Sequence, residues 1–246
     1  MERSLYEEHA RLEQDHWWFV GRRAIISAVL DRHLPAATER RILDVGCGTG
    51  GMLPTLARYG TVAGLEAEPL AVEHCHATFP SFPVELGGIP DQVPTNGALG
   101  VVTAFDVVEH IEDDHSAVAS LRSAVHRDGT IVVTVPALQA LWSDHDVVNG
   151  HKRRYDRRGL SALLRGADLE LAHLSYFNTA LLPAVAAARL AQRFRRSPGG
   201  PESDFSMPAT QVNRILTRVF SSERQLVTGC GLPLGVSLIA VAHRRS

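Results

Sequence analysis

Short apolar runs alternate with longer amphipathic stretches through the middle of this chain. Runs rich in Val, Ile and Leu predict strands at residues 41–45, 61–65, 83–86, 99–104, 130–135, 169–176 and 236–242. The segments between most of them have helical spacing, and this alternation of strands and helices is typical of a mostly parallel sheet. We therefore expect an α/β fold with a seven-stranded, mostly parallel sheet and helices on both faces.

The first 40 residues predict a helical segment ahead of the sheet. Residues 21–34 are amphipathic, with Ile25, Ile26, Val29 and Leu30 on one side. Two tryptophans and two arginines, in the run 16–23, come just before this helix. One interpretation is a lid that closes over a bound ligand, and the other is a helix packed over the sheet edge by its aromatic side chains.

The connection between the last two predicted strands, residues 177–233, is unusually long. It predicts an apolar helix at 178–195 and a second helix at 210–228, with a polar linker at 197–204 between them. Long connections are usually functional or carry elements of their own. We interpret this one as an inserted helical cap, or as a dimerisation arm, within a single domain of residues 1–246.

A glycine-rich turn follows the first predicted strand, in the segment Arg41-Ile-Leu-Asp-Val-Gly-Cys-Gly-Thr-Gly50. Glycines turn the backbone tightly and remove side chains that would keep a ligand away. The helix that follows points free N–H groups at such a ligand. The turn therefore predicts a nucleotide-type cofactor site. Gly46, Gly48 and Gly51, with Glu66 twenty residues after Gly46, also satisfy a dinucleotide fingerprint.

Asp44 favours a different cofactor from a dinucleotide. A carboxylate two residues before the first glycine suits a sulfonium and an ammonium group better than a pyrophosphate. Here the chain resembles the class I S-adenosylmethionine (SAM)-dependent methyltransferases, whose first motif is similar to Leu43-Asp-Val-Gly-Cys-Gly-Thr-Gly50. Phe105-Asp-Val-Val-Glu-His-Ile111 is similar to the fourth motif of that family. The resemblance implies a Rossmann-like fold whose last strand is antiparallel. It also implies methyl transfer from SAM to an oxygen or nitrogen, less readily a carbon, of a small or lipid-like acceptor in secondary or cell-envelope metabolism.

The resemblance also implies which residues hold the cofactor. These are Trp18, Arg23, Asp44, Gly46, Cys47, Gly48, Gly50, Glu66, Ala67, Ile89, Ala104, Phe105 and His110. Family members often carry an Asp after the third strand that bonds the adenine, whereas this chain has Gly87-Gly88-Ile89-Pro90. We therefore expect backbone groups and apolar contacts to bind the adenine.

The loop after the fifth predicted strand, residues 142–155, combines two histidines with acidic, basic and aromatic side chains. Ligands of open α/β sheets bind at the carboxyl ends of the strands, where this loop lies. His145 and His151 are the candidates for removing a proton from the acceptor, since histidine titrates near neutrality. Trp142, Arg153, Arg154 and Tyr155 are the candidate substrate residues. The alternative is a turn joined by Asp–Arg pairs, with the histidines as structural donors.

Composition narrows the classes of partner. The net charge of −2 provides no general attraction for nucleic acid, and three cysteines without metal spacing suit a reducing cytoplasm. We expect no bound metal, since neighbours in His74-Cys75-His76 point about 100° apart on a helix. No apolar run is long enough to predict a transmembrane helix or a signal peptide. Arg189, Arg193, Arg195 and Arg196 are compatible with peripheral membrane contact, although cations packed at a helix end explain them more simply.

Two other function classes remain open at this point. An NAD-dependent oxidoreductase would share the glycine turn and Glu66, although no Tyr-x-x-x-Lys pair for hydride chemistry is evident. A non-catalytic SAM-binding protein would share the whole cofactor site, although its motif would be expected to have decayed. We expect a monomer or a homodimer.

Overall fold

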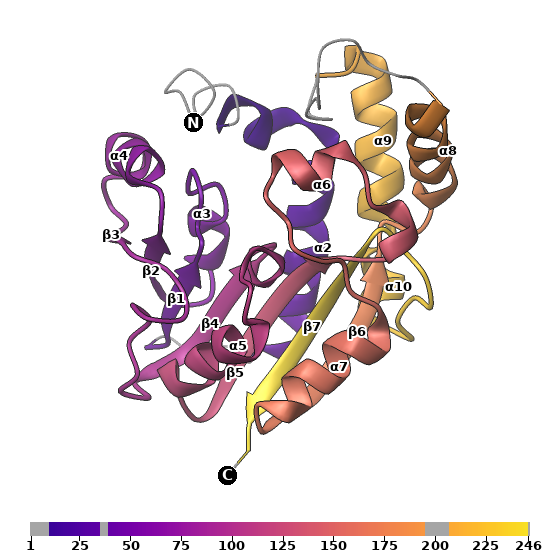
Figure 1. Cartoon of the computed structure of the whole chain (residues 1–246). Helices are drawn as coiled ribbons and strands as arrows, with labels where there is room; N and C mark the ends of the chain where they lie inside the picture. Colours follow the sequence, from indigo (N-terminus) through magenta and orange to yellow (C-terminus); the bar gives the residue numbers. More distant parts are fainter. Residues whose placement is uncertain (1–9, 35–38, 195–206, 246) are drawn as a thin grey trace.

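The sheet has the seven strands that the sequence predicts. The computed structural model describes residues 10–34, 39–194 and 207–245. The strands are β1 (Arg41–Val45), β2 (Thr61–Glu66), β3 (Val84–Leu86), β4 (Leu99–Phe105), β5 (Val125–Pro136), β6 (Leu169–Phe177) and β7 (Ser237–Arg244). Their spatial order is β3-β2-β1-β4-β5-β7-β6, and β7 runs antiparallel to both of its neighbours, β5 and β6 (Figure 1). The predicted mostly parallel sheet with an antiparallel last strand is confirmed.

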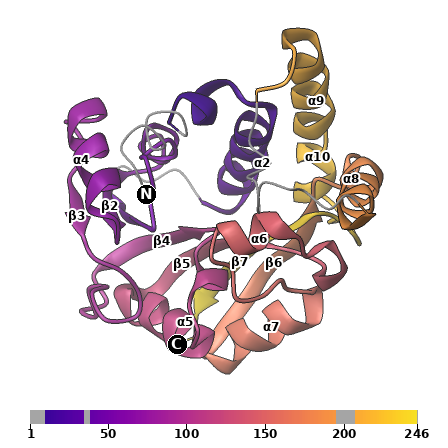
Figure 2. The same cartoon turned by 45° about the horizontal axis from the view of Figure 1, so that its top comes forward.

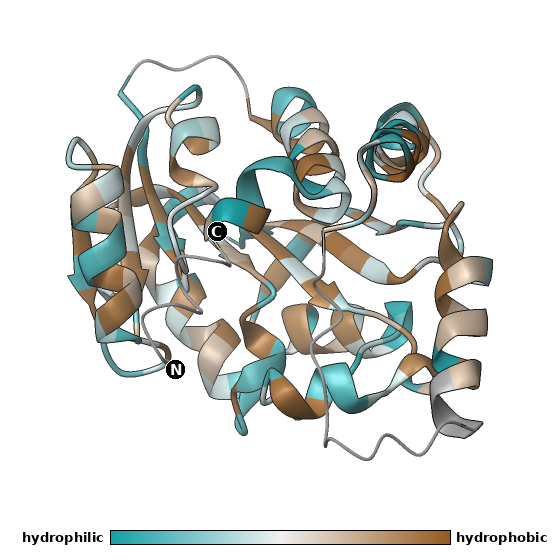
Figure 3. Cartoon of the chain, turned by 90° about the horizontal axis from the view of Figure 1, so that it is seen from above, coloured by the Kyte–Doolittle hydropathy of each residue, from teal (hydrophilic) through white to brown (hydrophobic). Residues whose placement is uncertain are grey.

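Helices cover both faces of this sheet. They are α2 (Trp17–His33), α3 (Leu53–Leu56), α4 (Pro69–Thr78), α5 (Asp114–Ala124), α6 (Asp144–Val148), α7 (Arg157–Gly166), α8 (Leu182–Phe194), α9 (Thr210–Ser222) and α10 (Arg224–Thr228), with short 3-10 turns η1 (Val108–His110) and η2 (Gln139–Leu141). Helices α5 and α7 pack on one face, and α2, α3, α4, α9 and α10 contribute to the core on the other. Hydrophobic residues accordingly concentrate along the strands (Figure 3). Adjacent residues Val101 and Val102 of β4 belong to opposite cores, as the pleat of a strand requires.

The apolar side of α2 forms part of the core. Ile25, Ile26, Val29 and Leu30 are all fully buried, as their helical spacing predicts. Gly21 lies on the same helix where α9 crosses it, and a Cβ there would meet the Phe220 ring at 2.3 Å. The ring of Phe220 also stacks on Phe177 at 6.1 Å between centroids. The long insertion is therefore joined to the domain core through α9.

The insertion departs from the predicted two helices in its second half. The segment expected to be one helix over 210–228 is divided into α9 and α10 at Glu223. The buried Glu223 carboxylate accepts hydrogen bonds from the backbone N–H groups of Thr179 and Ala180, at 3.0 and 2.7 Å. This contact connects the two ends of the insertion. The predicted linker at 197–204 lies outside the described residues.

Helix α9 lies beside α2, and α8 lies on the other side of α9 (Figure 2). Helix α8 is largely exposed, and Leu190 on it is 54% exposed. Among the described residues no helix is long and apolar enough to cross a membrane.

Candidate functional site

The glycine-rich turn occupies the carboxyl end of β1. Gly46 and Gly48 both have positive φ, at 65° and 57°, a conformation that side chains other than glycine rarely adopt. A Cβ on Gly46 would meet Val107 at 2.5 Å, whereas a Cβ on Gly48 would meet nothing within 4 Å. The backbone at Gly48 is therefore open to a ligand, as expected for a cofactor turn.

Asp44 lies beneath this turn and is 2% exposed. Its Oδ1 accepts a hydrogen bond from the Thr103 hydroxyl at 2.5 Å. Burial raises the pKa of Asp44 to about 7, although the Thr103 hydrogen bond and the Arg22 charge act in the opposite direction. A carboxylate in this position is costly without a nearby cation, and a cationic ligand would compensate for it.

Glu66 at the end of β2 braces the turn from its other side. Its carboxylate accepts hydrogen bonds from the backbone N–H groups of Gly48, at 2.7 Å, and of Glu68, at 2.9 Å. Ala67 lies next to it, close to the Gly88 backbone. This arrangement leaves carboxylate lone pairs available for ribose hydroxyls beside the turn.

Replacing Glu66 with Gln should weaken SAM binding by roughly 10–150-fold, the scale of losing charge-assisted hydrogen bonds worth about 1.5–3 kcal/mol. Titration calorimetry with SAM measures this change. Glu68→Gln is the matched control because its side chain is exposed, and it should bind SAM as the wild type does. Equal affinity in Glu66→Gln and the wild type would remove Glu66 from the site.

The start of α2 contributes aromatic and cationic groups to the same region. The guanidinium of Arg22 is buried, lies 2.5 Å from Asp106, and stands over the rings of Trp18 and Phe105 at 5.0 and 5.6 Å. Arg23, which the sequence favoured for the cofactor, points elsewhere, since its guanidinium donates to the backbone carbonyls of Glu13 and Gln14. The arginine that faces the site is therefore Arg22.

Glu13 is a site residue that the sequence analysis missed. Its carboxylate accepts a hydrogen bond from the Thr49 hydroxyl, and a Cβ on Gly51 would meet Glu13 at 2.4 Å. The residue therefore lies directly over the glycine turn. Glu13 belongs to no motif, and only the packing of residues 10–15 against the turn shows its role.

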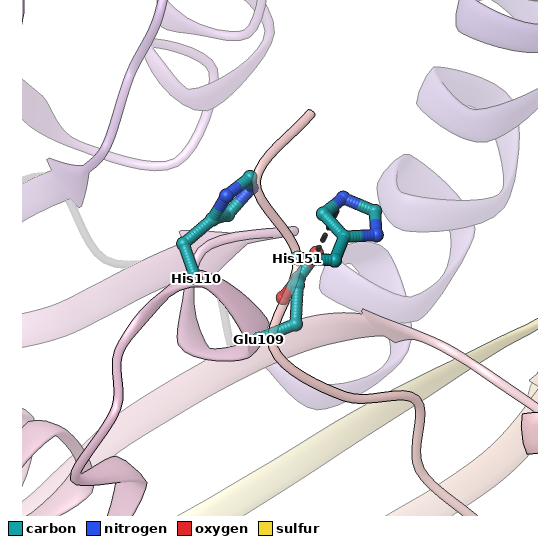
Figure 4. Close-up of side chains that lie close together, drawn as sticks. All are labelled: Glu109, His110 and His151. Atoms are coloured by element: carbon teal, nitrogen blue, oxygen red, sulfur yellow. Dashed lines mark ion pairs between the residues drawn. The ribbon is translucent and has the colours of Figure 1, made fainter. Parts of the chain in front are cut away.

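A buried polar cluster lies where β4 and β5 end. Glu109 and His110 belong to η1, and His151 follows α6 (Figure 4). Nδ1 of His151 donates to Oδ1 of Asp146 at 2.9 Å, and Nε2 of His151 lies 4.0 Å from Oε1 of Glu109. The ring of His145 stands 6.3 Å from that of His151. The structure thus brings together two histidines that the sequence named as catalytic and one, His110, that it named for the cofactor.

Burial, together with neighbouring charges and hydrogen bonds, sets the pKa values in this cluster. Burial would raise the pKa of Asp146, but hydrogen bonds from His151 and Arg154 hold that pKa well below its usual range. Burial, with the nearby Asp106 carboxylate, raises the pKa of Glu109 well above its usual value. Burial and the neighbouring His151 lower the pKa of His110. Asp146 is therefore ionised, and Glu109 is a buried carboxyl group without a matching cation beside it.

The predicted substrate residues separate into two groups. Arg154 reaches the site, but its guanidinium makes two hydrogen bonds to Asp146, at 2.8 and 3.1 Å. Arg153 points away from the site and pairs with Asp114 at 2.9 Å. The same Asp114 carboxylate accepts a hydrogen bond from the Tyr155 hydroxyl at 2.8 Å. Trp142 is half-buried beyond η2. Three of the predicted substrate residues lie outside the cavity lining, namely Arg153, Tyr155 and Trp142. Arg153 and Tyr155 are also already engaged in contacts with Asp114.

One cavity of about 620 Å³ connects the glycine turn, the start of α2, the polar cluster and the insertion. The sequence-predicted residues that line it are Trp18, Asp44, Gly46, Cys47, Gly48, Phe105, His110, His145, His151 and Arg154. Those outside its lining are Arg23, Gly50, Glu66, Ala67, Ile89, Ala104, Trp142, Arg153 and Tyr155. Helix α8 adds Val185 and Ala188, so the insertion forms one wall of the same cavity.

The residues His74, Cys75 and His76 do not converge. His74 contacts Thr78, His76 contacts the Val84 carbonyl, and the buried Cys75 thiol faces the Gly48 carbonyl. The tripeptide therefore offers no common centre for a metal ion.

Comparison with known proteins identifies the family of the chain. A family model described as a methyltransferase domain matches residues 18–174. The chain is 37% identical over 100 residues to a ubiquinone biosynthesis O-methyltransferase of Cronobacter sakazakii, covering 37% of this chain and 40% of that protein. It is 31% identical over 144 residues to the ubiquinone biosynthesis O-methyltransferase of Escherichia coli. This match covers 51% of this chain and 59% of that protein. The chain thus spans about half the length of these curated relatives.

A solved structure of a SAM-dependent methyltransferase from Archaeoglobus fulgidus has a similar fold. Its TM-score is 0.58 at 17% identity, and the match covers 90% of this chain and 94% of that one. At this identity the likeness concerns the fold alone.

Proposed function

Since the chain belongs to the methyltransferase-domain family and is a class I SAM-dependent methyltransferase, we propose that it methylates a hydroxyl oxygen on a small, largely apolar acceptor. The observation that carries this proposal is the single cavity in which the glycine turn, two histidines and an apolar helix face one another. Family membership also sets aside the two alternatives, an NAD-dependent oxidoreductase and a non-catalytic SAM-binding protein. The place in secondary or cell-envelope metabolism stays a prediction.

The cofactor end of the cavity has groups that fit SAM. Asp44 offers a buried carboxylate to a cationic ligand, and the backbone at Gly48 is open. Arg22 pairs with Asp106 through Nη2, but its Nε makes no hydrogen bond within the described residues and is available to the carboxylate of a ligand in the cavity. S-adenosylmethionine, when bound, supplies a methyl group on a cationic sulfur, which leaves as a neutral thioether when the acceptor oxygen bonds the methyl carbon. The residues of the chain align the acceptor and exclude water around it.

The acceptor end has groups that fit a hydroxyl. A hydroxyl oxygen must lose its proton as it is methylated, so it needs a proton acceptor nearby. We assign His151, which Asp146 orients, to fix the acceptor oxygen, and His145, which lines the cavity beside it, to take the proton. The two relatives named as O-methyltransferases support oxygen as the acceptor atom.

The wall formed by α8 supports an apolar acceptor body. Val185 and Ala188 of α8 line the cavity together with Pro208, and Arg189 of the same helix adds one cationic side chain. A largely apolar wall on one side and a polar cluster on the other would orient an acceptor that has one polar end. The alternative role for the insertion is dimerisation through its exposed apolar side chains, such as Leu190 and Ile215.

An acceptor panel tests this function. Phenols, alcohols and amines that carry apolar chains of graded length are incubated with SAM, and products are identified by mass spectrometry and NMR. We expect methyl ethers, and we expect Val185→Trp to lower kcat/KM for the longer acceptors by roughly tenfold, as a filled pocket does. Ala187→Trp is the matched control, because Ala187 is exposed on α8 outside the cavity lining. Products methylated only on nitrogen or carbon would contradict the proposal, and equal effects of both variants would remove α8 from the acceptor site.

A further inference from the structure

Three side chains with metal-binding atoms converge at the polar end of the cavity. Glu109, His110 and His151 each offer one ligand atom, and these atoms all lie within 4.8 Å of one another (Figure 4). Glu109 and His110 follow β4, whereas His151 follows α6 some 40 residues later. The adjacency of β4 and β5 in the sheet brings the two segments together.

The carboxylate of Glu109 is the observation that points to a ligand. Glu109 is 0% exposed, and neither of its carboxylate oxygens has a hydrogen-bond partner within residues 10–34, 39–194 and 207–245. A buried carboxylate almost always has a hydrogen-bond or charge partner. The two arginines nearby are committed elsewhere, because Arg22 pairs with Asp106 and Arg154 pairs with Asp146. Glu109 therefore lacks a cation, and its oxygens point toward two imidazoles.

The orientation of His151 fits the same conclusion. Its Nδ1 lies 2.9 Å from Asp146 and donates to it, so in the neutral ring the lone pair of Nε2 is on the side of Glu109, 4.0 Å away. A carboxylate that holds the far nitrogen of a histidine is the usual support of a metal-binding imidazole. The ring of His110 lies 4.8 Å from that of His151, with the two rings nearly perpendicular. Both imidazoles therefore border the space that Glu109 faces.

We propose that Glu109, His110 and His151 bind one divalent transition-metal ion that holds the acceptor hydroxyl. Two imidazoles and one carboxylate suit Zn²⁺, Mn²⁺, Fe²⁺ or Co²⁺ better than Mg²⁺ or Ca²⁺, which prefer oxygen ligands. Three protein ligands leave a position open for an oxygen of the acceptor. This site replaces the sequence-based expectation of no metal, which weighed only His74, Cys75 and His76.

The catalytic part of this inference rests on the proposed function, whereas metal binding stands independently of it. A metal ion acidifies a bound hydroxyl, so that the proton leaves to His145 and then to solvent. The oxygen then bonds the methyl carbon, and the carbon–sulfur bond breaks with its electron pair going to sulfur. The resulting ether oxygen carries no negative charge, binds the ion more weakly and is released.

Cobalt binding tests the site directly. The full chain, without a purification tag and stripped with a chelator, is titrated with Co²⁺ and followed by visible absorption. We expect one Co²⁺ per chain, and we expect Glu109→Gln and His151→Ala each to weaken binding by at least about tenfold. The control is the His74→Ala, His76→Ala double variant, whose imidazoles contact other groups and which should bind Co²⁺ normally. A wild type that binds no Co²⁺, or a Glu109→Gln variant that binds it equally well, overturns the proposal.

A second readout does not depend on the variants folding. Paramagnetically shifted N–H signals in the Co²⁺-loaded wild type should come from two histidines, and any other number contradicts the assigned ligands. SAM titrations of each variant show whether the cofactor end is intact. Metal binding without methylation of any hydroxyl would leave the metal site standing and contradict the proposed function. If the chelator-stripped enzyme binds no Co²⁺ but methylates a hydroxyl at the full rate, the metal site is contradicted and the proposed function stands.

Discussion

Replacing both His145 and His151 with alanine is expected to lower the rate of methyl transfer by roughly 10²–10⁴-fold. This is the usual loss when a proton acceptor is removed, and it corresponds to about 3–5 kcal/mol in the activation free energy. Both histidines line the cavity opposite the glycine turn, and Asp146 holds His151 in a single orientation. Single-turnover kinetics with an acceptor from the panel measure the chemical step itself.

The cofactor end provides the internal control for this prediction. SAM affinity should be unchanged in the double variant, because both histidines belong to the polar cluster, where His151 contacts Asp146 and Glu109 and His145 lies beside His151. His115→Ala is a matched control on α5, since this histidine lies outside the cavity lining and should leave the rate unaffected. A double variant that retains the rate within a few-fold would mean that the enzyme works by alignment alone.

Replacing Asp44 with Asn is expected to have opposite effects on binding and on stability. The variant should bind SAM more weakly by about 1.5–3 kcal/mol, or roughly 10–150-fold, because the cationic ligand loses a buried charge partner. The unliganded variant should nevertheless be more stable than the wild type at pH 8, since it no longer buries an ionised carboxylate. Calorimetry with SAM and urea unfolding without it measure the two effects.

The pH dependence separates these effects from an unspecific defect. Burial raises the pKa of Asp44 from 3.8 in the unfolded chain to about 7, so the folded state binds the proton more tightly. Between about pH 4 and pH 7 the contribution of this group to stability therefore falls as pH rises, by up to roughly 4 kcal/mol in total. The difference in unfolding free energy between Asp44→Asn and the wild type should grow over that window and level off above it.

Binding should change with pH in the opposite direction. A cationic ligand stabilises the ionised form of Asp44, so wild-type SAM affinity should rise between about pH 6 and pH 8, and the Asn variant should lose this rise. The exposed Glu85 of β3 supplies the control, because Glu85→Gln should alter neither profile. If the two Asp44 proteins show the same pH dependence of stability and binding, Asp44 is not the titrating group.

Neighbouring residues show where sequence reasoning stopped being sufficient. Arg22 and Arg23 are adjacent on a helix, where successive side chains point about 100° apart, so only one of them can face the cavity. Arg153 and Arg154 are adjacent in an extended segment, where successive side chains point to opposite sides, and they pair with Asp114 and Asp146 respectively. The sequence identified each pair as a candidate, but the choice within the pair depends on how the whole element is rotated.

Local chemistry was enough for the sheet, the cofactor turn and the core face of α2. Short-range spacing encodes all three: apolar runs form strands, glycines permit the positive φ of the turn, and helical periodicity buries Ile25 and its partners. The sequence by itself therefore determined the fold class and the cofactor family.

Tertiary structure alone decided what depends on contacts between distant segments. Glu13 reaches Thr49, Phe220 packs against Gly21, and Glu109 meets His151, because residues far apart in the chain become neighbours through strand order and helix packing. No local pattern carries these distances, since each one depends on the positions of many intervening residues. For this reason the polar end of the cavity, with its cluster of Glu109, His110 and His151, became visible only in the folded chain.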